Sequence, residues 1–267
     1  MRRFSFWHAL YLSFFSKEFY QDVGRRWPGV GLAYLFFLLV LAWLPLMVKL
    51  HLGMQSFARD HAPKIIQQLP RITITKGVVE TDPPGRHEIK DPDGKTFLII
   101  DPSIETLNLD ELPSVVALLT RTKLVIKQTN QRQTRVQDLS SIQSFSMDRS
   151  DAQRWAQALG RWMAVAVFPF ALLFSYVYRI CQLLFYALIG LALARGAATY
   201  PVVMRLTAVA VTPAVLVDTL KDLIPLPVPL WWLICFLIAM FYLDFALRAM
   251  REPEPESAAQ APPPIAG

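Results

Sequence analysis

Residues 87–101 read HEIKDPDGKTFLIID, a pattern that is typical of a β-hairpin in a water-soluble domain. Two short runs with strand character flank the turn DPDG at 91–94, where proline presets one backbone angle and Gly94 accepts a positive φ. The chain of 267 residues is nonetheless 54% hydrophobic, with a mean hydropathy of +0.33. The sequence therefore predicts a polar β-domain inserted into a chain that otherwise belongs in a membrane.

Outward from this hairpin, residues 51–161 form the one segment that is long and polar enough to fold in water. This segment carries 15 Lys and Arg against 13 Asp and Glu. Its further strand candidates are RITITKG (71–77), VVETD (78–82), VALLTRTKLVIKQT (116–129) and TRVQDLS (134–140). TRTK at 120–123 and TNQRQ at 129–133 are expected to close further hairpins. Residues 55–68 and 148–160 are predicted to be helical stalks, the second continuing into the next apolar run.

A first apolar run, VGLAYLFFLLVLAWLPLMV at 30–48, is uncharged and long enough to cross a bilayer core. Arg25 and Arg26 precede it, and positive charge beside a span marks the cytoplasmic side. The N-terminus is therefore expected to be cytoplasmic, with residues 51–161 outside the cytoplasmic membrane.

Residues 162–194 form a second apolar run, interrupted only by Arg179. As one helix it would measure about 50 Å at 1.5 Å per residue, against a hydrocarbon core of about 30 Å. It is therefore either one tilted helix or two helices that turn back near Arg179. Because a turn there would place Arg195 and Arg205 outside, we prefer one helix, with Arg179 near the cytoplasmic interface and its head group reaching water.

A third span is predicted from 201 or 205 to about 220, and a fourth from about 229 to 243. Trp231 and Trp232 at the start of the fourth are typical of a membrane interface. Four spans place both termini on the cytoplasmic side.

The two ends of the chain differ in character. Residues 1–28 carry aromatic side chains at three- and four-residue spacing, namely Phe4, Trp7, Tyr11, Phe14 and Phe15. This spacing predicts an amphipathic helix, which either lies in the membrane interface or packs on the helix bundle. Residues 251–267 are rich in proline and lack apolar periodicity, so they are expected to be disordered.

Together these patterns predict an α-helical integral membrane protein of about four transmembrane helices, with an inserted small antiparallel β (α+β) extracytoplasmic domain. In chain order we expect a cytoplasmic interfacial amphipathic helix (1–28), transmembrane helix 1 (29–50), an extracytoplasmic β-rich domain with helical stalks (51–161), transmembrane helices 2–4 (162–250) and a disordered cytoplasmic tail (251–267).

Several classes of function lack support in the sequence. The net charge is +6, but the excess lies beside apolar runs rather than in a basic stripe, so no nucleic-acid partner is expected. Nucleophile-elbow, zinc-protease, phosphate-loop and dinucleotide motifs are absent, so we expect no catalytic residue, no cofactor and no enzyme. Cys181 and Cys235 lie in apolar stretches, which favours buried thiols.

We also expect no metal site. His51, Asp60 and His61 cluster after the first span, but Asp60 and His61 are adjacent and would point in different directions on a helix. A solvated stalk is the preferred interpretation. The aspartates of DPDGKTFLIID lack the glycine and glutamate positions of a calcium loop.

The candidate functional residues are the intramembrane polar positions Asp218 and Arg179, together with Pro213. An ionisable group within a span generally faces a partner or water, and a nearby proline frees a backbone carbonyl, as in ion pathways. The alternative places Asp218 at the outer interface, one turn from Lys221 and Asp222, and we prefer that alternative.

The stretches FYQDVGRRWPGVGLAYLFFLLVLAWLP (19–45), APKIIQQLPRITITKGVVETD (62–82), ALLTRTKLVI (117–126) and TPAVLVD (212–218) resemble a bacterial family of multi-pass inner-membrane proteins of unknown function. Some of its members are labelled maltodextrin-utilisation membrane proteins, and a more distant likeness extends to Yip-type membrane proteins. The resemblance implies one span, an extracytoplasmic insert and then a cluster of spans. It supplies no catalytic residues.

The leading hypothesis is a non-enzymatic accessory, scaffold or sensor protein of the bacterial cytoplasmic membrane. Its partners would be the lipid bilayer and a membrane or envelope protein or ligand bound by residues 51–161. The alternative is a small transporter or channel-like protein that uses Asp218 and, having few spans, works as a homo-oligomer. A third hypothesis is a lipid-modifying enzyme with a polar pocket at the interface.

Overall fold

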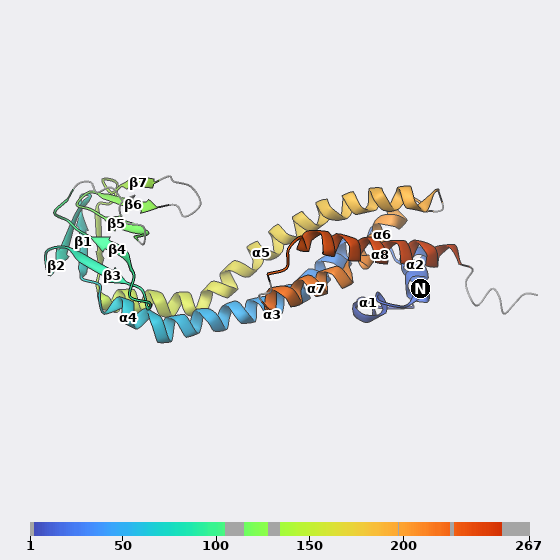
Figure 1. The fold of residues 1–267 in the computed structure, drawn as a ribbon, viewed down its shortest axis with the longest axis horizontal. Helices are drawn as coiled ribbons and strands as arrows, with labels where there is room; N and C mark the ends of the chain where they lie inside the picture. The colour runs from blue at the N-terminus through green and yellow to red at the C-terminus, as the bar shows by residue number, and fades with distance from the viewer. Residues whose placement is uncertain (1–2, 105–114, 128–133, 197, 225–226, 253–267) are drawn as a thin grey trace, which may run out of the picture. The chain divides into compact units, whose positions relative to one another are not determined.

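The computed structural model describes residues 3–104, 115–127, 134–196, 198–224 and 227–252. The chain divides into two compact units, a helical unit of residues 1–49 and 164–267 and a β unit of residues 50–163 (Figure 1). Of the tail expected to be disordered, Arg251 ends a helix and residues 253–267 lie outside the described residues, as does most of the expected turn at 129–133.

The helical unit is built from long apolar helices that confirm the predicted fold class. Among the described residues, four segments are long and apolar enough to cross a membrane: 32–66, 149–194, 200–223 and 231–251. The helices are α1 (Phe6–Leu12), α2 (Lys17–Arg26), α3 (Leu32–Ser56), α5 (Arg149–Ala194), α6 (Tyr200–Ala210), α7 (Thr212–Leu223) and α8 (Trp231–Arg251).

Two of the apolar runs form helices in different ways. The run at 162–194 does not turn back, because it belongs to the single helix α5 of 46 residues. The third span instead consists of α6 and α7, which meet at Val211. Pro213 lies in the first turn of α7, where its missing N–H and fixed φ are tolerated.

The N-terminal segment forms two helices rather than the single amphipathic helix that was expected. The break occurs because the side chain of Ser16 accepts a bond from the backbone N–H of Phe19 at 3.2 Å and begins α2. In α1 only Ala9 is buried. In α2, Phe19 and Tyr20 are fully buried in the core. Packing on the bundle therefore describes α2 and one side of α1, where Phe6 is partly buried against the core, whereas Trp7 and Tyr11 of α1 are exposed.

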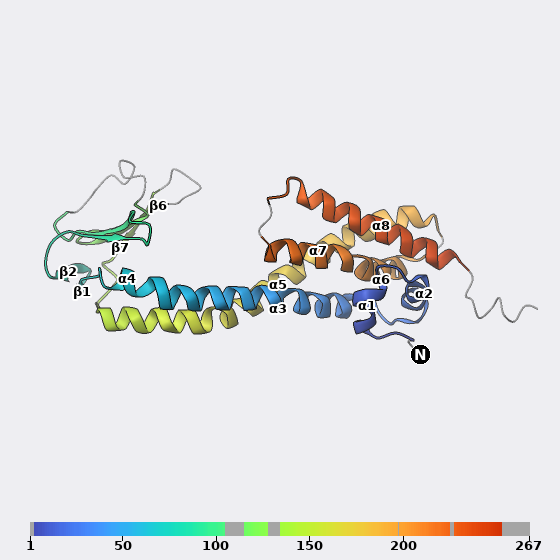
Figure 2. The same ribbon diagram turned by 60° about the horizontal axis from the view of Figure 1, so that its bottom comes forward.

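Small residues allow the helices of this unit to approach closely. Helix α8 contacts α2, α6 and α7, and it lies beside α7 in both views (Figures 1 and 2). A Cβ added to Gly190 of α5 would lie 2.8 Å from a methyl of Val203 and 2.9 Å from one of Leu243. Close packing of small residues is how membrane helices associate without a hydrophobic driving force.

The β unit contains two sheets and the ends of two helices. One sheet has the strand order β2-β1-β8 and the other β3-β4-β5-β6-β7. The strands are β1 (Arg71–Thr75), β2 (Val78–Asp82), β3 (His87–Lys90), β4 (Thr96–Ile100), β5 (Ala117–Leu119), β6 (Lys123–Lys127), β7 (Thr134–Asp138) and β8 (Ser144–Met147). The π-helical turn η1 (Phe57–His61) and α4 (Ala62–Ile66) follow α3.

The predicted turns join the predicted strands. At DPDG, Asp91 Oδ1 accepts bonds from the backbone N–H groups of Asp93 and Lys95, and Gly94 has φ +82°. At TRTK, the N–H of Thr120 donates to the carbonyl of Lys123 at 2.9 Å. Both hairpins are thus confirmed.

The sheets differ from the expected antiparallel arrangement at one place. Strands β4 and β5 are parallel, so they are not the two arms of a simple hairpin. One core lies between the two sheets and contains Ile72, Ile74, Val79, Ile89, Ile100 and Leu139. A second lies on the other face of the larger sheet and contains Ile99, Val115, Leu118 and Val125. Alternation along β4 buries Ile99 and Ile100 on opposite faces.

Candidate functional site

Two of the three sequence-predicted residues meet in the helical unit. Arg179 of α5 donates from Nη2 to Oδ2 of Asp218 on α7 at 2.7 Å, and the indole N–H of Trp231 on α8 donates to Oδ1 at 2.8 Å. The side chains of Arg179 and Asp218 are 15% and 29% exposed. The ion pair and the indole bond together link three helices and occupy both carboxylate oxygens.

The guanidinium is also held from its own helix. Arg179 Nη1 donates to Gln182 Oε1 at 2.7 Å, and Gln182 Nε2 donates to the hydroxyl of Tyr186 at 2.8 Å. These contacts follow one face of α5 at intervals of three and four residues. We call Arg179, Gln182, Tyr186, Asp218 and Trp231 the polar network.

The position of the polar network corrects the interpretation of Arg179. Asp218 lies five residues before the end of α7, and Trp231 is the first residue of α8. Arg179 is therefore level with the end of the bundle where α7 stops and α8 starts. It does not reach alone toward water, as was expected, because an ion pair within the protein replaces hydration.

Pro213 does not belong to the polar network. The residue lacks an N–H for the carbonyl of Val209, four residues earlier, but the hydroxyl of Thr212 donates to that carbonyl at 2.6 Å. The hydroxyl of Tyr34 lies 2.7 Å from the same Thr212 oxygen. The backbone carbonyl that proline frees is thus already satisfied, which removes the expected ion ligand.

Several helix ends in this unit are bonded by side chains of other helices. Lys49 of α3 donates to the carbonyls of Asp222 and Leu223, each at 3.0 Å. Arg251 of α8 donates to the carbonyl of Leu193 at 2.9 Å. Such contacts satisfy terminal carbonyls and place positive charge at the negative end of a helix dipole.

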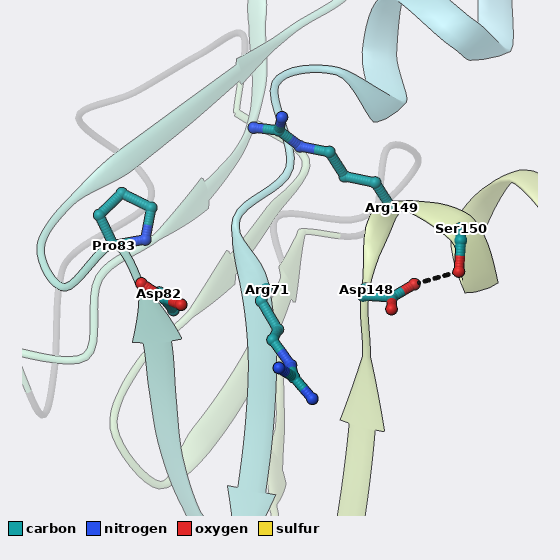
Figure 3. A pocket seen from close by; sticks show the side chains of 6 residues that line it. All are labelled: Arg71, Asp82, Pro83, Asp148, Arg149 and Ser150. Atoms are coloured by element: carbon teal, nitrogen blue, oxygen red, sulfur yellow. Dashed lines mark hydrogen bonds between the residues drawn. The ribbon is translucent and has the colours of Figure 1, made fainter.

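The β unit holds a different arrangement of charges. A cavity of about 440 Å³ is lined by Arg71, Asp82, Pro83, Asp148, Arg149 and Ser150. Arg71 on β1 lies between Asp82 on β2 and Asp148 after β8 (Figure 3). Among the described residues, the side chains of Arg71 and Asp82 form no ion pair within 4.0 Å, although the strand register places the two residues opposite each other.

Asp148 at the edge of this cavity caps α5. Its Oδ1 accepts bonds from the N–H of Asp151 at 2.8 Å and the hydroxyl of Ser150 at 2.7 Å. The backbone bond from Asp151, followed by the Ser150 hydroxyl, lowers the pKa of Asp148 from 3.8. Arg149 meanwhile donates from Nε to the carbonyl of Leu69 at 2.9 Å. The cavity thus presents charged groups of both signs on a rigid frame.

Comparison with protein families identifies the group to which the chain belongs. A family model described as a protein of unknown function (DUF1189) matches residues 7–247. The chain belongs to the DUF1189 family. No curated protein and no solved structure matches the chain.

This DUF1189 chain offers no metal centre in its described part, where no group of three or more His, Cys, Asp and Glu converges. His51 contacts Gln55, whereas Asp60 accepts a bond from Ser56. Cys235 is buried as expected, but Cys181 is exposed on the surface of α5.

Sequence reasoning on this DUF1189 protein selected Arg179 and Asp218 separately and missed their pairing. The signal was present, since two opposite charges within apolar spans are expected to find each other. Trp231 was predicted to lie at the membrane interface. No local sequence pattern predicts the hydrogen bond from its indole N–H to Asp218.

Proposed function

We propose that the protein is a non-enzymatic accessory or sensor protein of the bacterial cytoplasmic membrane, whose β unit faces outward and binds an envelope partner or ligand. The observation that carries this proposal is the contrast in charge pairing. The polar network of the helical unit is satisfied internally, whereas Arg71 and Asp82 line an open cavity without side-chain ion pairs among the described residues.

The cavity suits a ligand or loop that carries both charge signs. A guanidinium recognises a carboxylate or phosphate, and the carboxylate of Asp82 recognises an ammonium or another arginine. Mixed charges of this kind fit a polar peptide segment or a zwitterionic small molecule better than a uniformly anionic polymer.

The outward orientation of the β unit comes from charge asymmetry. Arg25 and Arg26 precede α3, and Arg248 and Arg251 end α8, so the positive-inside rule places these ends in the cytoplasm. The β unit then lies on the other side. The maltodextrin label of some resembling proteins is not transferred to this chain as a substrate.

A transporter role for Asp218 is the second candidate, because an ionisable residue within a span is a common substrate or proton site. The bonds from Arg179 and Trp231 favour a structural role instead, since both carboxylate oxygens already have partners. Transport would require that the ion pair open during each cycle.

Co-purification of the full chain in mild detergent tests the leading proposal. We expect Arg71→Ala with Asp82→Ala to reduce recovery of the partner at least fivefold relative to the unchanged chain. The matched control is Arg86→Ala with Glu88→Ala, which removes an exposed ion pair on the neighbouring hairpin and should leave recovery unchanged. Equal recovery with both double variants would contradict binding at this cavity.

A further inference from the structure

Helix α5 carries a continuous stripe of apolar side chains that are exposed in the described part of the chain. Trp155, Leu159, Trp162 and Ala166 are apolar and exposed, and so are the residues 11 and 22 positions after each of them, as far as Leu188. This spacing corresponds to about 3.67 residues per turn, so the stripe runs almost straight along the helix. We call these residues the α5 stripe.

A different face of α5 contacts the end of α3 and the turn η1. A Cβ on Gly160 would lie 3.0 Å from the Cβ of Ala58 and 3.3 Å from the carbonyl of Met54. Beside this contact lies a cavity of about 360 Å³, lined by Gln55, Ala58, Arg59, Gln157, Gly160 and Arg161. No residue of the α5 stripe belongs to this lining, and the stripe stays exposed although α3 is close to the same helix.

The α5 stripe is longer than the hydrocarbon of a bilayer can cover. From Trp155 to Leu188 it runs over 33 residue steps of one continuous helix, which is about 50 Å at 1.5 Å per residue. The hydrocarbon core is about 30 Å thick. A helix tilted by about 40°, the upper end of the usual range, has roughly 39 Å of its length inside that core. At least about 11 Å of the stripe, or two helical turns, therefore lies outside the hydrocarbon.

The part outside the hydrocarbon is the end that carries Trp155. Arg179 is level with the end of the bundle where α8 starts, and the carbonyl of Leu193 accepts a bond from Arg251 at the end of α8. Helix α8 is therefore level with residues 179–193 of α5. Trp162 lies 17 residues beyond Arg179 on the same helix, which is about 25 Å. Trp155 and Trp162 are 67% and 61% exposed, and large apolar side chains that face water mark an interaction surface.

We propose that this part of the α5 stripe packs against the α5 stripe of a second copy of the chain. Two copies inserted in one membrane share orientation and depth, so each stripe meets the same residues of the other in parallel, about a twofold axis. Apolar residues that repeat at this spacing are typical of a seam between two helices, and no charged residue interrupts the stripe. A different protein would need an apolar stripe of matching length and depth, whereas a second copy has both.

This inference does not rest on the proposed function, because it concerns a contact between two copies rather than binding at the cavity beside Arg71. Cysteine cross-linking of the full chain in cell membranes tests it, with Cys181 and Cys235 replaced by serine. Mild oxidation should link more than half of Leu159→Cys into a product of twice 30.3 kDa, because facing positions of a parallel helix pair come within disulfide reach. Gln153→Cys, exposed on another face of α5, should link less than a tenth. Mass spectrometry identifies both halves of the product.

The dimer dissociation constant of the purified chain in mild detergent gives a second measurement. Leu159→Glu should raise this constant at least tenfold, because a charge is buried in an apolar contact. Gln153→Glu adds the same charge outside the stripe and should leave the constant unchanged. Leu159 is 45% exposed in the single chain, so thermal unfolding of the dilute Leu159→Glu chain should match that of the unchanged chain. A chain that stays monomeric at all concentrations, cross-links of Leu159→Cys to other proteins only, or equal weakening by both glutamates would overturn the proposal.

Discussion

The charges inside the helix bundle and the arginines that line the cavities of the β unit are paired differently. In the helical unit, Arg179 and Asp218 are bonded to each other across helices, and Lys49 and Arg251 bond the carbonyl ends of other helices. In the β unit, arginines line two cavities, and three of them, Arg59, Arg71 and Arg161, form no side-chain ion pair among the described residues. The difference follows from the cost of an unpaired charge, which is high in hydrocarbon and low beside water. Charged side chains without an ion-pair partner are therefore the ones that we expect to be available for binding.

The largest effect is expected from breaking the ion pair of the helical unit. Asp218→Ala leaves the Arg179 guanidinium partly buried without its counter-charge, which should lower the free energy of unfolding by about 3 to 5 kcal/mol. Unfolding of the full chain by denaturing detergent measures this change.

The matched control removes both charges. Asp218→Leu with Arg179→Leu should recover most of the loss, because a hydrophobic pair of similar volume replaces the ion pair. If the double variant is as unstable as the sum of its single variants, or if Asp218→Asn abolishes an ion flux in proteoliposomes while the fold is kept, the structural assignment is wrong.

A somewhat smaller loss is expected from the β unit alone. Gly77 has φ +80°, and a Cβ there would lie 2.7 Å from the Cα of Ser140. Gly77→Val should therefore destabilise the β unit by about 3 kcal/mol through backbone strain and a steric clash. Faster amide hydrogen exchange in β1 and β2, with unchanged exchange in α8, measures this effect. Gly94→Ala, at φ +82° with nothing within 4 Å, should cost only about 1 kcal/mol; an equal effect of both changes would contradict the clash.

The helix-end contacts should contribute less. Lys49→Met removes two bonds to the last carbonyls of α7 and should lower the unfolding free energy by about 1 kcal/mol. Thermal unfolding in detergent detects it. Lys95→Met, in the exposed turn of the β3–β4 hairpin, provides the comparison and should change stability by less than about 0.5 kcal/mol. A larger effect of Lys95→Met would argue against the importance of the cap.

The smallest effect is a pH dependence at the N-terminus of α5. The bonds from Asp151 and Ser150 lower the pKa of Asp148 in the folded chain. The stability that this carboxylate contributes is therefore present above its ordinary value of 3.8 and is lost as the pH falls through the lower folded value. Hydrogen exchange in the first turn of α5 should accelerate over that acidic range in the unchanged chain but not in Asp148→Asn. If exchange accelerates equally in the unchanged chain and in Asp148→Asn, the pH dependence must come from another titratable group.

Local patterns made much of the fold predictable. The apolar runs, the DPDG turn and the continuation of the 148–160 helix into α5 are each encoded within a few neighbouring residues. Strand β8 was missed because the run SFSM is short and is defined by its pairing with β1. The parallel pairing of β4 with β5 is likewise a property of the whole sheet that no local motif specifies.

The site was less predictable than the fold, because its main contact joins residues that are far apart in the sequence. Arg179 and Asp218 are 39 residues apart, and the charge rule alone assigned them to opposite interfaces. The hydroxyl of Thr212 that satisfies the carbonyl freed by Pro213 is a local contact that a search for Ser or Thr beside an intrahelical proline would have found. That Arg59, Arg71 and Arg161 lack ion-pair partners could not be predicted from the sequence, because it depends on the positions of all their described neighbours.

Thiol labelling in intact cells tests the outward orientation of the β unit most directly. With Cys181 and Cys235 replaced by serine, Arg86→Cys lies in an exposed connection of the β unit and Pro28→Cys in an exposed connection between α2 and α3. We predict that a membrane-impermeant maleimide labels the cysteine at 86 in intact cells and reaches the one at 28 only after the cytoplasmic membrane is opened. The reverse pattern would place the β unit in the cytoplasm and contradict its role as the external binding region.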